Sequence, residues 1–314
     1  MLALTALLSA DTLLLMTTSK WTPKDLPSQS GRTVVITGAN SGIGLAAARE
    51  LGRAGARVVL AVRDEARGRD AAGSIAGETE VRKLDLADLS SVHAFADGFD
   101  GDVDVLINNA GVMAIPERRT ADGFEMQIGT NHLGHFALAN LLLTQIRDRV
   151  VVVASGAHRM GEIRLDDLNW EQGGYKSWRA YGQSKLANLL FTFELQRRLA
   201  DAGSDVRAVA AHPGYAATNL QSHTGNVIQH VGMWIGNKLI AQSDEQGAWP
   251  TLYAATQDVA GDSYVGPDGF QEGRGHPTLV GRSDAARDAG VARKLWERSE
   301  QLTGVSFPLQ PAAA

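Results

Sequence analysis

The 314-residue chain contains no cysteine, and this absence removes several kinds of chemistry. Disulfide bridges, thiolate nucleophiles and cysteine-ligated metals are all excluded. An excess of basic residues is missing too, because the formal net charge is -5. The sequence therefore gives no indication of a surface that binds nucleic acid.

Metal-ligand patterns are also missing among the eight histidines. His132 and His135 lie on one face of an expected helix, yet no carboxylate joins them at the spacing typical of zinc enzymes. We therefore expect packing or surface roles for the histidines and no metal site.

A hydrophobic run long enough to span a bilayer is not found in the N-terminal segment. Residues 1–16 are apolar, but Asp11 interrupts them and leaves pieces shorter than a transmembrane helix. No basic region precedes the run and no clear cleavage site follows it, so a secretory signal is not indicated. Three interpretations stay open: an extension that is floppy or packed on the surface, a peripheral membrane contact, or a true start at Met16. We expect a cytoplasmic protein without an integral membrane span.

Short apolar segments that lack polar alternation recur along the chain. They cover residues 33–37, 57–62, 81–84, 103–107, 150–154 and 206–211. Helical patterns lie between or after them, notably over residues 45–54, 120–146, 177–202 and 283–303. Buried strands separated by helices are typical of a parallel sheet covered on both faces. The sequence therefore predicts an α/β protein with a doubly wound, Rossmann-type parallel sheet.

The domain boundaries follow from where this pattern begins and ends. No internal repeat, low-complexity stretch or linker divides the chain. We expect a leader over residues 1–30, a single Rossmann-fold domain over 31–305 and a tail over 306–314. Within the domain, residues 215–250 hold tryptophans among small residues and are predicted to form a small helical substrate cap.

A glycine-rich turn follows the first predicted strand, and its sequence is Gly38-Ala39-Asn40-Ser41-Gly42-Ile43-Gly44. Gly38 allows a tight turn, Gly42 lets backbone amides approach a pyrophosphate, and Gly44 lets the next helix pack closely on the sheet. The helix N-terminus adds free N–H groups and partial positive charge. Because a strand precedes this glycine loop (residues 38–44) and a helix follows it, we interpret it as a dinucleotide-binding loop rather than a mere turn.

The end of the second strand indicates which dinucleotide is bound. An acid there would accept from a ribose 2′-hydroxyl, but Val62 occupies that place and Arg63 follows it. A guanidinium can bind a 2′-phosphate and stack on adenine, so NADP(H) is preferred over NAD(H). Asp64 is the counter-argument, because it could pair with Arg63 or accept from a ribose.

The end of the third strand is expected to meet the adenine edge through Asp85 and Leu86. The alternative for Asp85 is an N-cap of a helix over residues 86–99.

Tyr181 and Lys185 stand four residues apart in an expected helix, so their side chains share one face. A free tyrosine has a pKa of about 10, and a nearby positive charge favours the phenolate. A shift of about three units needs roughly 4 kcal/mol, which Lys185 alone could hardly supply. An oxidised nicotinamide ring would bring a second positive charge.

Together these motifs resemble the short-chain dehydrogenase/reductase superfamily over about residues 31–305. The resemblance is carried by the glycine loop, Asn108-Asn109-Ala110-Gly111, Ser155, Tyr181 to Lys185, and His212-Pro213-Gly214 with Thr218 beyond. Two further stretches, residues 131–136 and 264–269, are similar to the branch that contains retinol dehydrogenases and protochlorophyllide reductases.

The resemblance implies a four-residue catalytic set. Tyr181 would be the acid/base, Lys185 would hold the nicotinamide ribose, Ser155 would bind the substrate oxygen, and Asn131 would serve a proton relay. Gly156 follows Ser155 where many members carry a second serine, so Ser155 must act alone. Asn131 could kink its apolar helix around a water that leads to Lys185, or it could simply bond to local backbone.

The remaining cofactor contacts are expected on loops after later strands. Asn109, Ala110 and Gly111 would form the pocket wall beneath the cofactor. Pro213 and Gly214 would turn the chain across the nicotinamide, and Thr218 could reach its carboxamide or a phosphate.

The leading hypothesis is an NADP(H)-dependent oxidoreductase that transfers hydride between nicotinamide and an apolar carbonyl or alcohol substrate. Met160, Trp170, Trp178, Tyr215, Met233 and Trp234 are candidates for the apolar walls, or they simply pack the cap. The alternatives are a cofactor-binding regulatory protein without turnover and a C=C reductase on the same fold, although the lack of cysteine weighs against a thiol proton donor. A homodimer or homotetramer is plausible by the resemblance.

Overall fold

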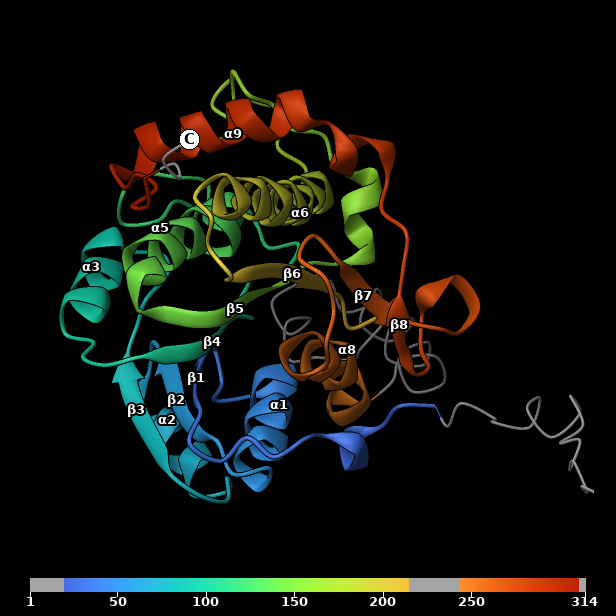
Figure 1. Cartoon of the computed structure of the whole chain (residues 1–314). Coiled ribbons are helices and arrows are strands. Elements are labelled where there is room, and N and C mark those ends of the chain that lie inside the picture. Colours follow the sequence, from blue (N-terminus) through green and yellow to red (C-terminus); the bar gives the residue numbers. More distant parts are fainter. Residues whose placement is uncertain (1–19, 215–242, 311–314) are drawn as a thin grey trace, which may run out of the picture.

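The computed structural model describes residues 20–214 and 243–310, and its centre is an eight-stranded sheet (Figure 1). The strands are β1 Thr33–Thr37, β2 Arg57–Val62, β3 Thr79–Lys83, β4 Val103–Asn108, β5 Ile146–Val153, β6 Arg207–Ala211, β7 Tyr264–Pro267 and β8 Pro277–Leu279. Their order across the sheet is β3-β2-β1-β4-β5-β6-β7-β8. The predicted α/β fold with a doubly wound, Rossmann-type sheet is confirmed.

The order in which successive strands join the sheet reverses at β1. Strands β2 and β3 lie on one side of it, and β4 and the later strands lie on the other. Ile36 in β1 pairs with Leu60 in β2 on one side and with Ile107 in β4 on the other, and both pairings are parallel. Ligands bind at such switch points, outside the carboxyl ends of the strands. Only β8 runs antiparallel to its neighbour, β7. The apolar-run pattern did not reveal these last two strands, because each is only three or four residues long.

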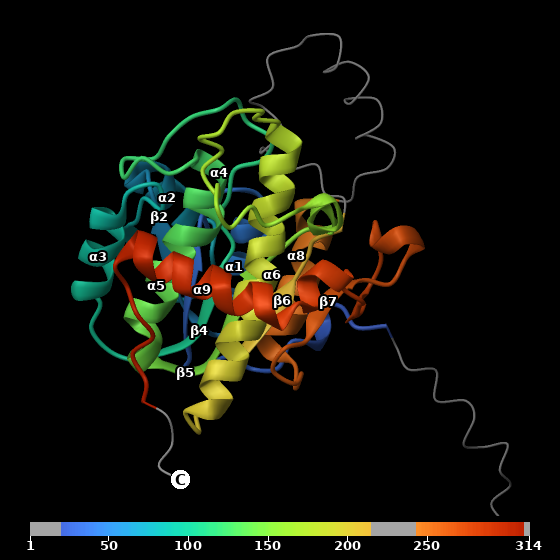
Figure 2. The ribbon, with the colours of Figure 1, turned by 90° about the horizontal axis from the view of Figure 1, so that it is seen from above.

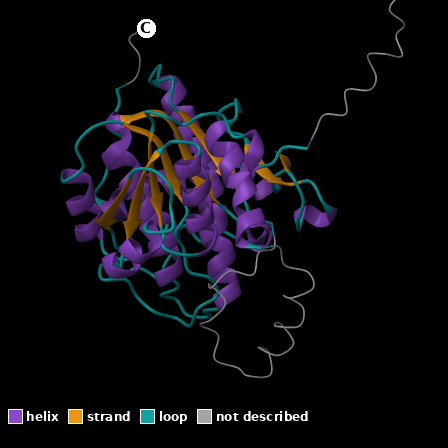
Figure 3. Ribbon diagram, turned by 90° about the horizontal axis from the view of Figure 1, so that it is seen from below, coloured by secondary structure: helices purple, strands orange, loops and turns teal. Residues whose placement is uncertain are grey.

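Helices cover both faces of the sheet (Figures 1 and 3). They are α1 Gly42–Arg53, α2 Glu65–Ala72, α3 Leu89–Asp97, α4 Met126–Ile128, α5 Gly134–Leu142, α6 Ser177–Asp201, α8 Asp244–Thr256 and α9 Ala289–Thr303. Helices α1, α2 and α8 lie against one face, while α3, α5 and α6 lie against the other. Helix α9 crosses the outer side of α6 (Figure 2).

The core explains why the strands read as continuous apolar runs. Val34 and Ile36 pack with α1 and α8, whereas Val35 between them packs with the α3, α5 and α6 layer. Each fully buried side chain of this kind contributes about 1.5–3 kcal/mol to folding. A strand buried on both faces needs apolar side chains at successive positions, which explains the continuous apolar runs in the sequence.

The expected helix over residues 120–146 is wrong as a single element. The chain forms α4, then a π-helix over Gly129–Leu133, then α5, and strand β5 already begins at Ile146. The apolar pattern of a π-turn and of an α-helix is nearly the same over one turn. The insertion was therefore not visible in the spacing of hydrophobic residues.

Two other helices begin later than expected, each at an aspartate. Helix α3 starts at Leu89 because the Asp88 carboxylate accepts from the N–H groups of Ser90 and Ser91. Helix α9 starts at Ala289, where the Asp288 carboxylate accepts from the N–H groups of Gly290 and Val291 in the same way. An N-cap that satisfies free N–H groups fixes the start of a helix more firmly than its apolar pattern.

Most of the predicted cap over residues 215–250 lies outside the described residues. The part that is described belongs to α8, which packs against α1 and the sheet. The leader residues 1–19 and the last tail residues 311–314 also lie outside the described part. No helix within residues 20–214 and 243–310 is long and apolar enough to cross a membrane.

Candidate active site

The glycine loop lies at the carboxyl end of β1, at the switch point of the sheet. Helix α1 begins at Gly42, three residues earlier than the sequence pattern indicated, and Gly42 has a φ of 57°. Ser41 is the N-cap, but its hydroxyl makes no capping hydrogen bond. The first N–H groups of α1 are therefore left for an anion, as the predicted pyrophosphate contact of Asn40, Ser41, Gly42 and Ile43 requires.

Close packing requires glycine at both ends of this loop. A Cβ atom on Gly38, whose φ is +67°, would lie 3.0 Å from the Cβ of Ala110. A Cβ atom on Gly44 would lie 2.5 Å from Nδ2 of Asn109 and 2.7 Å from the carbonyl oxygen of Gly38. Asn109 fixes this approach further, because its side-chain amide donates to the carbonyl of Thr37 at 2.8 Å. The backbone cradle fits a dinucleotide phosphate.

Two aspartates, Asp64 and Asp85, follow the ends of β2 and β3 and have different partners. Asp64 does not pair with Arg63; its carboxylate accepts from the N–H groups of Ala66 and Arg67 and caps α2. Arg63 is exposed and makes no hydrogen bond or ion pair within the part of the chain described here. Its guanidinium is therefore available to a ligand at the end of β2.

Asp85 is not the cap of α3, so that alternative is wrong. Its carboxylate accepts from the N–H of Ala87 at 3.0 Å, and Asp88 caps the helix instead. Leu86 is buried in the core on the α3 side of the sheet. The adenine contacts of Asp85 and Leu86 stay predictions.

Tyr181 and Lys185 lie in α6 under the end of β5. The Tyr181 ring is only 6% exposed, and Nζ of Lys185 lies 5.8 Å from its centroid. Nζ donates to the carbonyl oxygen of Val153, the last residue of β5, at 3.0 Å. Trp178 meets the Tyr181 ring edge to face, with centroids 6.0 Å apart. The shared helix face predicted from the spacing is present.

Burial dominates the protonation of both groups. It raises the pKa of Tyr181 to about 12, and a hydrogen bond with Ser155 opposes this rise. Burial lowers the pKa of Lys185 to about 8. In the protein alone the pKa of Tyr181 is raised rather than lowered, because desolvation is the largest influence on it. The phenol is held in its protonated form.

Ser155 follows β5 directly and starts a short 3₁₀ helix over Gly156–Met160. Its hydroxyl oxygen accepts from the N–H of Ala157 at 3.2 Å and so caps this helix. A hydroxyl that accepts there can still donate its proton elsewhere, and the hydrogen bond with Tyr181 brings the two catalytic candidates together.

Asn131 lies inside the π-helix, so the predicted kink is present at this residue. Its side chain is fully committed to structure: Oδ1 accepts from the N–H of Val112 at 2.8 Å, and Nδ2 donates to the Val112 carbonyl and the Ser184 hydroxyl, each at 2.9 Å. A Cβ on Gly111 would lie 3.0 Å from Oδ1 and 3.7 Å from Nζ of Lys185. The backbone-bonding interpretation therefore holds for the side chain, which nevertheless adjoins Lys185.

His135 has a larger role than the packing or surface role expected from the sequence. Its Nδ1 donates to the Asn131 carbonyl at 3.0 Å, so Nε2 accepts from the Thr37 hydroxyl at 2.9 Å. The Thr37 oxygen in turn accepts from the N–H groups of Asn109 and Ala110, each at 2.9 Å. Burial keeps His135 neutral by lowering its pKa to about 4. One histidine thus ties the π-helix to the start of the glycine loop, and only its four-residue distance from Asn131 hinted at it.

The turn after β6 is described only through Gly214. Gly214 has a φ of 68°, and its N–H donates to Nδ1 of His212 at 3.2 Å. Pro213 lies half-buried beside it. Thr218 and the wall candidates Tyr215, Met233 and Trp234 lie outside the described residues.

The remaining wall candidates divide into two groups. Met160 is 58% exposed and Trp178 is 49% exposed, and both adjoin Ser155 and Tyr181 along the chain or across the ring contact. Trp170 is buried and packs instead against Tyr175. Within residues 20–214 and 243–310 no group of three or more His, Asp or Glu side chains could hold a metal ion.

A phosphate cradle at a sheet switch point, with a protonated tyrosine and a buried lysine beside it, defines an oxidoreductase that uses a dinucleotide. Comparison with known proteins gives the family. The family model described as short chain dehydrogenase matches residues 32–227, and the chain belongs to this family.

The curated relatives have alcohol-oxidising names. Human retinol dehydrogenase 13 is 43% identical, with 88% of this chain and 86% of the relative covered. Mouse polyprenol dehydrogenase is 39% identical, with 90% of this chain and 87% of the relative covered. Among solved structures, an uncharacterised protein of Mycobacterium paratuberculosis is 58% identical with a TM-score of 0.82, covering 93% of this chain and all of that one. The chain is therefore an NAD(P)-dependent oxidoreductase of the retinol dehydrogenase branch, acting on alcohol or carbonyl groups.

The close approach of Gly44 generates a stability prediction. Gly44→Ala places a methyl group against Asn109 and the Gly38 backbone, so we expect a loss of about 1–3 kcal/mol from the unfolding free energy. Urea unfolding measures it. Gly281→Ala is the matched control, since nothing lies within 4 Å of its Cβ position. Equal stability of the two variants would contradict the packing argument.

Proposed function

We propose that this chain is an NADP(H)-dependent oxidoreductase that interconverts apolar alcohols and carbonyl compounds, with Tyr181 as the acid/base. The observation that carries the proposal is the meeting of Tyr181, Ser155 and Lys185 at the carboxyl end of β5. This end of the sheet also holds the glycine loop, which follows β1, and only β4 lies between β1 and β5.

In the direction of reduction, Tyr181 donates its phenolic proton to the substrate carbonyl oxygen. Ser155 donates its hydroxyl proton to the same oxygen as a hydrogen bond and stabilises the negative charge that develops there. In the direction of oxidation, the Tyr181 phenolate takes the alcohol proton. A bound nicotinamide dinucleotide supplies or accepts the hydride and, when oxidised, brings a positive charge to the site.

Oxidation needs the positive charge of the oxidised nicotinamide, because the Tyr181 phenolate must form near neutral pH. Moving the pKa of Tyr181 from about 12 to neutrality requires roughly 7 kcal/mol of differential stabilisation. Lys185, whose pKa burial lowers to about 8, brings one charge and cannot provide this alone. Lys185, anchored on the Val153 carbonyl, instead offers its remaining protons to ribose hydroxyls.

The preference for NADP(H) is supported by the end of β2. Asp64 caps α2 through Oδ1 and does not pair with Arg63, so it does not neutralise the guanidinium. Arg63 is exposed beside it and can pair with a 2′-phosphate.

The substrate class is supported by two kinds of observation. The relatives are named as dehydrogenases of retinol and polyprenol, both apolar alcohols. In this chain the exposed side chains of Met160 and Trp178 offer apolar surface next to the catalytic groups. The assignment to the cytoplasm and the homodimer or homotetramer stay predictions from the sequence.

Removing the phenol tests the acid. We expect Tyr181→Phe to lower kcat by at least about 100-fold, the usual contribution of a general acid, while NADPH binding changes little. Steady-state turnover of an apolar aldehyde and equilibrium binding of NADPH measure the two quantities. Tyr253→Phe, a half-buried tyrosine on α8, is the control. Turnover retained in Tyr181→Phe would remove Tyr181 from the mechanism; loss in both variants would show a general effect on folding.

Removing the guanidinium tests the cofactor preference. Arg63→Ala should weaken NADPH binding by about 10- to 100-fold, the value of one to two charge-assisted contacts, and should change NADH binding by less than about 3-fold. Arg293→Ala, exposed on α9, controls for the loss of one positive charge. Equal weakening of NADPH and NADH by Arg63→Ala would mean that Arg63 does not read the 2′-phosphate.

A further inference from the structure

A strained segment joins β7 to β8. Gln271 and Glu272 both have positive φ angles, 50° and 55°. A non-glycine residue in this region costs about 1–3 kcal/mol, and the described part of the chain has no other consecutive pair of this kind. Strain of this size persists only where contacts with neighbouring residues hold the backbone in place, so we expect such contacts around Gln271 and Glu272.

The contacts are made by the carboxylate of Glu272. Its Oε2 lies 3.1 Å from Nε2 of His212, and its Oε1 lies 3.3 Å from a guanidinium nitrogen of Arg159. His212 is buried, with 2% of its side chain exposed, and Nε2 has no hydrogen-bond partner in the described residues, so the Glu272 carboxylate acts on it through charge and proximity. The contact with His212, followed by the charge of Arg159, holds the pKa of the Glu272 carboxyl below its ordinary value.

His212 connects Glu272 to the turn after β6. Its Nδ1 accepts from the N–H of Gly214, so the ring proton must lie on Nε2, facing Glu272. A carboxylate next to one ring nitrogen fixes which nitrogen carries the proton. Glu272 therefore keeps Nδ1 free to hold Gly214, whose φ of 68° belongs to the same turn.

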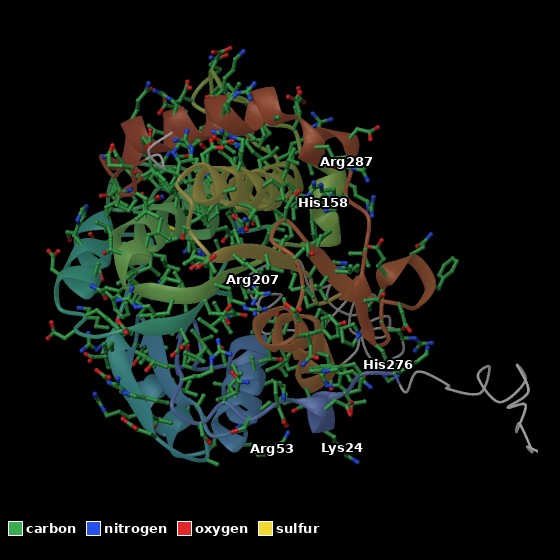
Figure 4. The ribbon with its side chains drawn as sticks, in the orientation of Figure 1. Lys24, Arg53, His158, Arg207, His276 and Arg287 are labelled. Atoms are coloured by element: carbon green, nitrogen blue, oxygen red, sulfur yellow. The ribbon has the colours of Figure 1, made fainter. Side chains whose placement is uncertain are left out.

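Arg159, the second partner of the Glu272 carboxylate, connects Glu272 to the segment that begins at Ser155. Arg159 lies in the short helix that Ser155 begins, and it also donates to the Gly281 carbonyl at 3.2 Å. Next to it, Nδ1 of His158 donates to the Ser155 carbonyl at 2.7 Å. Figure 4 shows His158 between α6 and β7.

The ring of Tyr264 closes the cluster. It packs between His158 and His212, with centroid distances of 5.7 Å and 5.0 Å. Tyr264, the first residue of β7, and Glu272, in the loop between β7 and β8, thus both join the segment after β5 to the segment after β6.

We propose that Glu272 is a positioning residue that sets the distance between Ser155 and the Pro213–Gly214 turn across the nicotinamide pocket. It acts by fixing the ring tautomer of His212 on one side and the place of Arg159 on the other. This inference rests on the proposed function, in which Ser155 binds the substrate oxygen and Gly214 borders the cofactor. Glu272 lies beyond residues 32–227, which the family model matches.

Replacement of Glu272 separates a positioning role from a structural one. We expect Glu272→Ala to raise the dissociation constant and the KM for NADPH about 10-fold, while kcat changes less than about 3-fold, because Tyr181 and Lys185 remain in place and Arg159 keeps its bond to the Gly281 carbonyl on the Ser155 side. Glu272→Gln keeps an oxygen that can accept from Nε2–H, so its NADPH affinity should stay within about 2-fold of wild type. Gln271→Ala, with the same backbone strain and no polar contact in the described residues, is the matched control.

A double-mutant cycle checks the route through His212. His212→Asn removes the ring that faces Glu272 and leaves a short acceptor near Gly214, so in this background Glu272→Ala should change NADPH affinity by less than about 2-fold. Should Glu272→Ala not fold, Glu272→Asp withdraws the carboxylate from both partners and is expected to weaken NADPH about 3-fold.

The outcomes are distinct. NADPH affinity in Glu272→Ala equal to wild type, or Glu272→Gln as weak as Glu272→Ala, overturns the positioning role while the proposed function stands. Additive losses in the cycle overturn the route through His212. A wild-type chain that binds no NADPH in the absence of substrate overturns the proposed function and this inference with it.

Discussion

Burial of the Tyr181 phenol and the Lys185 ammonium under the carboxyl end of β5 is the constraint on which the rest of the site depends. Desolvation raises the pKa of the tyrosine to about 12, so the phenol stays protonated, and it lowers the pKa of the lysine to about 8, so the ammonium keeps its charge at neutral pH less firmly than usual. Such a pair is ready to donate a proton but poorly able to accept one. The surrounding structure must therefore bring positive charge to this place, and the glycine loop is built to hold a cofactor that carries it.

A chain of hydrogen bonds connects the segment that carries Asn131 to the strand end from which the glycine loop begins. His135 links the Asn131 carbonyl in the π-helix to the Thr37 hydroxyl at the end of β1, and Thr37 holds the backbone of Asn109. These groups come from β1, the π-helix and the loop after β4, which meet at the sheet switch point. The Asn131 carbonyl that His135 contacts belongs to the π-helix.

The sequence predicted the parts of this site whose signal is local. Glycine spacing, apolar strands and the four-residue spacing of Tyr181 and Lys185 survive in the structure, because short segments determine them. The π-helix was missed because its hydrophobic pattern matches that of an α-helix. The direction of the Tyr181 pKa was missed because burial arises from strands far away in the chain. Glu272 was missed because its partner His212 is sixty positions distant and no spacing rule joins them.

The central claim, that burial holds Tyr181 protonated until a positive cofactor arrives, is tested most directly by titrating its phenol. The measurement is the phenolate absorbance of the wild type minus that of Tyr181→Phe, with and without NADP⁺. The account predicts no ionisation of Tyr181 below about pH 10.5 in the free protein, and ionisation at least about two pH units lower with NADP⁺ bound. A Tyr181 phenolate that forms near or below pH 10 without the cofactor would contradict it.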